Sequence, residues 1–199
     1  MDTWFEIVIR QLILYSLPVL ISLSCVAMVE LKLTHTPLSQ PFSAMNSRAV
    51  WLPLLASISF HRGVIICMNR AMVVGVRGAF IRLCVHLLLM LLGLLLYFLS
   101  LSHMSPSGLP PLHHWWAKVL MFFNLCMVCM HLLPLPGQLL GEWLWQKRSR
   151  GWLEMLFLQR NGWLLLTLLA ASPLIDLLLG ANIIFPLYEG MANSVANLS

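Results

Sequence analysis

The sequence predicts an all-α integral membrane protein with about four transmembrane helices. Of its 199 residues, 60% are hydrophobic and only 10% are charged, whereas soluble domains carry roughly 45–50% apolar and about 25% charged residues. The mean hydropathy is +0.86. A chain this short and apolar could not cover its core with polar surface, which excludes a soluble enzyme, a nucleic-acid-binding protein and a disordered chain. No internal repeat divides the chain, so we expect residues 1–199 to form a single polytopic membrane domain.

Four segments approach the length of about 20 apolar residues that a helix needs to cross a hydrocarbon layer roughly 30 Å thick. They are residues 11–29, 83–101, 116–135 and 163–183. The stretch 50–60 is apolar but too short to cross, and it contains Pro53. We therefore expect a re-entrant or interfacial segment between the first and second spans. Residues 141–160 combine tryptophan and leucine with basic residues, which fits an interfacial amphipathic helix as well as an ordinary charged loop.

The basic residues predict the orientation of these spans. Ten of the twelve Lys and Arg residues lie in the connections 30–82 and 141–162, and the other two are Arg10 and Lys118. Cytoplasmic loops of membrane proteins carry an excess of Lys and Arg, so both long connections are expected in the cytoplasm and both termini on the outer side. Several tryptophans, including Trp115 and Trp116, fall near the ends of the spans, which is typical of a membrane-interface belt.

Ionisable side chains near the cytoplasmic ends of the spans are candidate ligands. His86 and His131 lie about one turn inside the second and third spans, and Glu30 and His35 follow the first span on the same side. Imidazoles and a carboxylate could bind zinc, and His86 and His131 could alternatively hold a haem iron. Each histidine could instead simply bond a neighbouring carbonyl. Asp176, in the fourth span, could relay protons, pair with a cation, or be hydrated near the outer interface.

The third span ends in an unusual pattern. Residues 131–141 read H-L-L-P-L-P-G-Q-L-L-G and follow Asn124-Leu125. Two prolines and two glycines break the helix at membrane depth, where freed carbonyl groups need protein or water partners. This stretch resembles the third core helix of the site-2 protease family of intramembrane zinc metalloproteases, which reads N-L-L-P-x-P-x-L-D-G. Leu132, Leu133, Pro134 and Pro136 match that pattern, and His131 replaces the asparagine.

The resemblance implies a site-2-protease-like core from which the zinc ligands have been lost. The H-E-x-x-H motif of the family would fall on residues 29–33, which read V-E-L-K-L. Val29 and Leu33 stand at the positions of the zinc-binding histidines, and Leu139 (Leu140 if one residue is inserted) at the position of the ligand aspartate. Glu30 matches the general base of the family. Because zinc must activate the attacking water, the mechanism of the family cannot run on these residues, and the resemblance implies an inactive relative without a cofactor.

We therefore expect a non-catalytic scaffold, assembly or accessory subunit of a larger membrane complex. Its expected partners are the lipid bilayer and other integral membrane subunits, not nucleic acid, and a prokaryotic cytoplasmic (inner) membrane suits its size and resemblance. Two alternatives stay open. One is a rearranged zinc metalloprotease with Glu30, His35 and His131 as ligands, and the other is a redox subunit with haem between His86 and His131.

Overall fold

Every regular element in the described part of the chain is a helix. The computed structural model describes residues 2–34, 48–67, 75–101, 110–135, 137–147 and 156–197. In chain order, the helices are α1 (Asp2–Leu33), α2 (Arg48–Ser59), α3 (Gly75–Leu101), α4 (Leu112–Met130), α5 (Leu139–Lys147), α6 (Leu156–Ala171), the π-helix η2 (Asp176–Ile184) and α7 (Phe185–Ala196). The expected all-α class is confirmed for these residues.

Among the described residues, two helices are long and apolar enough to cross a membrane. They are α1, over Thr3–Leu33, and α3, over Gly75–Leu101. The predicted spans 11–29 and 83–101 lie inside them. Both helices carry many exposed leucine, isoleucine and aromatic side chains, which a helix can present to lipid hydrocarbon but not cheaply to water. This apolar surface therefore indicates a membrane protein.

The fourth predicted span is a broken helix. Its apolar halves, Trp163–Ala171 and Asp176–Ala196, meet at an angle of 73°. Pro173 lies at the break, and a proline both lacks an N–H donor and disfavours helical geometry in the residue before it. If this bent pair forms one span, the described residues offer three spans, and otherwise two.

The third predicted span corresponds to α4, which ends at Met130 and is the most enclosed of the long helices. Phe123, Asn124 and Cys126 on α4 are fully buried, because α1 and α3 pack against it. A helix surrounded by protein can carry polar groups that a lipid-facing helix cannot. By length and composition, α4 does not qualify as a membrane span among the described helices. A total of four spans stays a prediction.

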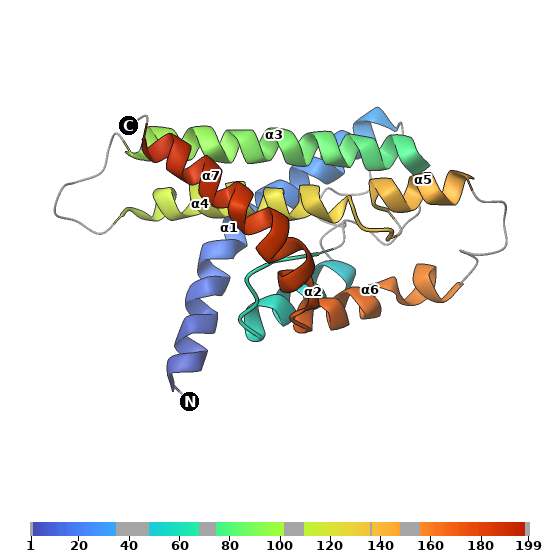
Figure 1. Ribbon diagram of the computed structural model, residues 1–199, viewed down its shortest axis with the longest axis horizontal. Helices are drawn as coiled ribbons and strands as arrows, with labels where there is room; N and C mark the ends of the chain where they lie inside the picture. Colours follow the sequence, from blue (N-terminus) through green and yellow to red (C-terminus); the bar gives the residue numbers. More distant parts are fainter. Residues whose placement is uncertain are drawn as a thin grey trace.

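The pair formed by α3 and α4 is the centre of the fold, and the two helices lie side by side along the long axis (Figure 1). A Cβ atom added at Gly93 of α3 would lie 2.6 Å from the backbone nitrogen of Met121 in α4. Glycine therefore allows the two backbones to approach closely, as small residues do between membrane helices. The C-terminal helix α7 crosses this pair, and Phe185 and Tyr188 pack on Phe122 of α4.

A second layer lies below this pair in Figure 1 and consists of α2 and α6, which are in contact. The apolar part of α2, Val50–Ser59, is too short to span. After α2 the chain turns at His61, whose φ is 50°, and residues 64–67 run extended and buried at 0–2% exposure. The expected short apolar segment between the first two spans is thus a helix followed by a buried extended stretch.

The predicted amphipathic helix 141–160 is described only in part. Its first residues belong to α5, which ends at Lys147 and contacts α3. Glu142 of α5 is buried, whereas Trp143 is 43% exposed with Lys147 stacked 4.2 Å above its ring. Residues 148–155 lie outside the described part of the chain, and α6 begins at Leu156.

Candidate functional site

A buried ion pair joins the end of α1 to the start of α3. Arg82 donates from Nε to one carboxylate oxygen of Glu30 at 2.8 Å and from Nη2 to the other at 3.0 Å. The two side chains are 10% (Glu30) and 3% (Arg82) exposed. A planar guanidinium matches a carboxylate in this two-pronged geometry. Both oxygens of Glu30 are therefore engaged by a fixed cation within the chain itself.

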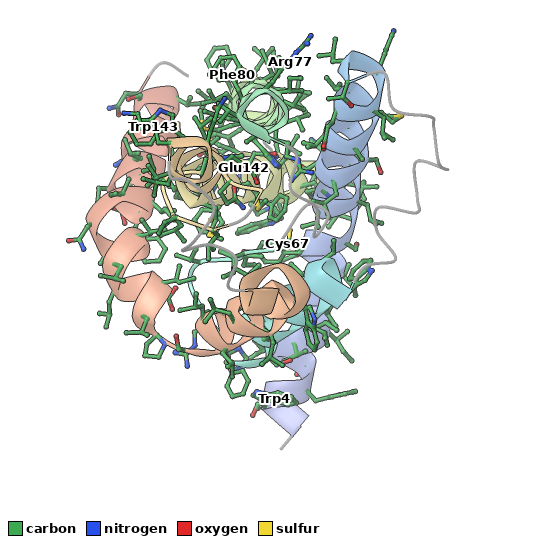
Figure 2. The ribbon with its side chains drawn as sticks, turned by 90° about the vertical axis from the view of Figure 1, so that its right-hand side faces the viewer. Trp4, Cys67, Arg77, Phe80, Glu142 and Trp143 are labelled. Carbon is green, nitrogen blue, oxygen red and sulfur yellow. The ribbon has the colours of Figure 1, made fainter. Side chains whose placement is uncertain are left out.

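The same arginine reaches the segment that follows α4. Arg82 Nη1 lies 3.4 Å from the carbonyl oxygen of Gly137. The two segments that carry the resemblance, around Glu30 and around residues 131–141, thus meet at one guanidinium group. Figure 2 views this end of the molecule, with Arg77 and Phe80 of α3 at the top and Glu142 and Trp143 of α5 below them.

Glu142 holds the broken segment after α4 in place. Its carboxylate accepts the backbone N–H of Gly137 at 2.8 Å and the N–H of Gly75, the first residue of α3, at 3.0 Å. A buried carboxylate is stabilised by such amide donors and by the positive end of a helix dipole. Gly141 is equally constrained, because a Cβ atom there would collide with the carbonyl of Leu135. The chain after the Pro-Gly break is therefore a fixed structure and not a loose helix end.

A chain of buried hydrogen bonds crosses from α3 through α4 to α1. Asn124 donates from its amide nitrogen to Ser22 Oγ and to the carbonyl of Leu120, both at 2.8 Å. The amide oxygen of Asn124 then lies 2.8 Å from Nδ1 of His86. Because that oxygen can only accept, Nδ1 of His86 carries the proton. Asn124, Ser22 and His86 are each 0% exposed, so this network satisfies polar groups that would otherwise be costly at this depth.

The two candidate haem ligands lie near each other, but the hydrogen bonding of His131 leaves it no nitrogen lone pair for a metal. The ring centroids of His86 and His131 are 6.3 Å apart. Nδ1 of His131 accepts the backbone N–H of Leu139 at 3.1 Å, so a neutral His131 ring holds its own proton on Nε2. A ring nitrogen needs a free lone pair to bind iron or zinc. In this state neither nitrogen of His131 offers one.

The predicted zinc set is brought together only in part. Glu30 is paired with Arg82, His131 is bonded to Leu139, and His35 lies outside the described residues. Within the described ranges, no group of three or more His, Cys, Asp and Glu side chains could hold a metal ion. Of the three residues that the resemblance would align with zinc ligands, Val29 and Leu139 are half-buried and Leu33 is exposed.

Asp176 lies at the break between α6 and η2 and binds backbone. Its two oxygens accept the N–H groups of Val64 at 2.8 Å and Gly63 at 3.3 Å. Arg62 donates from Nε to the carbonyl of Ala171 at 2.8 Å, which fits a cation at the C-terminal end of a helix. These contacts tie the extended stretch after α2 to the broken helix, and they favour a structural role for Asp176 over the relay of protons.

Three residues of the candidate site, Arg82, Glu142 and Ser22, were not singled out by sequence reasoning. Arg82 entered only as one of many basic residues that set orientation, and Glu142 and Ser22 carried no motif. Arg82 lies within a turn of the predicted start of its span, and Glu142 follows the Pro-Gly break at once. A charge so close to membrane depth needs a partner, which is the signal that would have identified both.

Comparison of the chain with protein-family models, with curated proteins and with solved structures gives no match.

Proposed function

We propose that this chain is a non-catalytic, site-2-protease-like membrane protein that acts as a scaffold, assembly or accessory subunit of a larger membrane complex. The observation that carries the proposal is the engagement of both Glu30 oxygens by Arg82. In the resembled family the glutamate at this position would act on a zinc-bound water. Here its partner is an internal cation, and both oxygens of the carboxylate are held by hydrogen bonds from Arg82.

The meeting of the two motif-like segments supports the resemblance itself. Glu30 at the end of α1 and Gly137 after α4 both contact Arg82, although 107 residues separate them along the chain. Segments that would supply zinc ligands in the family must converge in space, and these do converge. The positive charge where the two segments meet is the guanidinium group of Arg82. This group balances the negative charge of Glu30, as a metal ion would, but it does not activate water.

The outer surface of α3 supports a role in assembly. Its leucines at positions 88, 91, 95 and 99 are 49–66% exposed and follow helical spacing on one side. A partner helix could replace lipid on this surface, because membrane helices associate by van der Waals packing of their sides. We propose a prokaryotic cytoplasmic membrane, which suits the size and the resemblance of the chain. We propose that both termini lie on the outer side, because the basic residues concentrate in the two long connections.

The experiment that tests the proposal is purification of the tagged full chain from its native membrane in a mild detergent, followed by identification and quantification of the chains that accompany it. A defined membrane subunit in constant ratio is the expected result. Leu91→Asn and Leu95→Asn on the exposed α3 surface should lower that ratio, while Leu178→Asn on η2, also exposed at 65%, serves as a control of the same chemistry. A monodisperse chain without a partner would contradict the proposal.

A further inference from the structure

The end of the molecule at which α3 begins exposes charges of one sign. Among the side chains that the structure describes there, Lys32, Arg77 and Lys147 are exposed. The carboxylates of Glu30 and Glu142 are buried, and each accepts hydrogen bonds from inside the fold. The described surface at this end is therefore positive, because its acidic groups face inward and its basic groups face outward.

Two of these cations accompany exposed aromatic side chains. The ammonium group of Lys147 lies 4.2 Å above the ring of Trp143, which is 43% exposed. Arg77 and Phe80 lie three residues apart on α3, so their side chains emerge on the same side of the helix, and Phe80 is 55% exposed. We call these four residues the basic-aromatic surface. Figure 2 shows Arg77 and Phe80 at its top and Trp143 at its left.

The length of α3 places the basic-aromatic surface at the level of lipid headgroups. At about 1.5 Å per residue, the 27 residues of α3 cover about 40 Å, which matches the roughly 40–45 Å of a bilayer with both headgroup layers. Arg77 and Phe80 belong to the first two turns of this helix. Trp143 follows Glu142, whose carboxylate accepts the N–H of Gly75 at the start of α3 at 3.0 Å. Both basic-aromatic pairs therefore lie near one end of the span.

The chemistry of the two pairs suits the headgroup layer of an anionic membrane. Exposed aromatic rings favour the boundary between hydrocarbon and headgroups, and basic side chains beside a span are attracted to anionic lipids. A guanidinium group also matches the geometry of phosphate oxygens. A zwitterionic headgroup neutralises its own phosphate, whereas an anionic headgroup leaves a net negative charge for the protein to balance.

We propose that the basic-aromatic surface binds anionic glycerophospholipids, with Arg77 and Lys147 balancing the headgroup charge and Phe80 and Trp143 lying at the edge of the hydrocarbon. This site goes beyond the proposed scaffold function and does not rest on it. It lies at the end of α3, apart from the exposed leucines of α3 on which assembly depends, so either proposal can fail without the other.

The test compares two lipids that differ in headgroup charge. The full chain is reconstituted in vesicles of equal parts phosphatidylglycerol, which is anionic, and phosphatidylcholine, which is zwitterionic, with identical acyl chains. It is then extracted in a mild detergent, and the retained lipid is counted by native mass spectrometry. The wild type should retain phosphatidylglycerol over phosphatidylcholine by about fivefold or more, the factor that corresponds to one basic residue near an anionic surface.

The same measurement at high salt tests whether charge is the cause. The preference for phosphatidylglycerol should fall when the extraction is repeated at high salt, because salt screens exposed charges. Equal retention of the two lipids, no retained lipid, or a preference that salt leaves unchanged would overturn the proposal. None of these comparisons needs a variant.

Two variants locate the site. The double variant Arg77→Gln/Lys147→Gln should lower the ratio of phosphatidylglycerol to phosphatidylcholine by about fivefold or more. The matched control is Arg10→Gln, which should keep the wild-type ratio. Arg10 is also exposed, but the exposed Glu6 lies one turn before it on α1, so that surface carries both signs of charge.

An unchanged ratio in the double variant, or an equal loss in Arg10→Gln, would refute the assignment to this surface. Release of an accompanying protein chain by the double variant, with no change in retained lipid, would assign the surface to an acidic protein partner and would also overturn the proposal.

Discussion

Removal of either partner of the Glu30–Arg82 pair should strongly destabilise the protein. The contacts are 2.8 and 3.0 Å long, and the side chains are 10% and 3% exposed, so each single substitution leaves an unpaired buried charge. Such a change costs about 3–5 kcal/mol, which lowers the folding equilibrium constant by roughly two to three and a half powers of ten. We expect this loss for Glu30→Gln and for Arg82→Met.

The double variant Glu30→Gln/Arg82→Met should recover most of the loss, because it removes both charges together. Arg77→Met is the control, since Arg77 lies exposed on the same helix and its replacement should change stability by no more than about 0.5 kcal/mol. The assay is equilibrium unfolding in mixed micelles at increasing denaturing detergent. The reasoning is refuted if Glu30→Gln unfolds with the wild type, or if the two single effects simply add.

Three further substitutions test the packing and the polar contacts, two by the same unfolding assay and one by hydrogen exchange. Gly93→Ala should push α3 from α4 and cost about 1–3 kcal/mol. Gly190→Ala lies within α7, where a Cβ atom meets nothing within 4 Å, and it should stabilise by about 0.5–1 kcal/mol, because alanine favours a helix over glycine. Equal effects of the two substitutions would contradict the close approach of α3 and α4. Asn124→Leu leaves buried polar groups unsatisfied and should cost about 1–3 kcal/mol, and stability like the wild type would mean that the network is not formed. Asp176→Ala should expose the amide of Val64 to faster hydrogen exchange, and unchanged exchange there would show that the carboxylate is not its acceptor.

Composition and periodicity predict the class of this protein well, because long apolar stretches have few other solutions. The predicted spans 11–29 and 83–101 accordingly lie inside α1 and α3, two helices that are long and apolar enough to cross a membrane. The bend of 73° near Pro173 is harder to foresee. A proline can kink a helix or end it, and which of the two happens depends on whether neighbours satisfy the freed backbone groups. Here α6 ends at Ala171, and the following residues begin a new direction supported by Asp176 and Arg62.

In the candidate site too, the sequence reveals individual polar residues but not the partners with which they pair in the fold. Glu30, His86 and His131 are visible in the sequence as polar groups at membrane depth. Their partners are not visible, because Arg82 and Asn124 come from other helices and pairing across helices leaves no spacing signal. The ion pair changes the meaning of Glu30 from a candidate base or ligand to one half of a structural contact, and the bond from Leu139 similarly occupies a nitrogen of His131.

The most direct test of the inactive-relative interpretation is the zinc content of the chain, measured by elemental mass spectrometry after gentle purification without chelators. We predict no stoichiometric zinc in the wild type and no change in metal content on His131→Ala. One zinc ion per chain that disappears in His131→Ala, or a stabilisation of the wild type by added zinc that Glu30→Gln abolishes, would contradict the interpretation of Glu30 as the partner of Arg82.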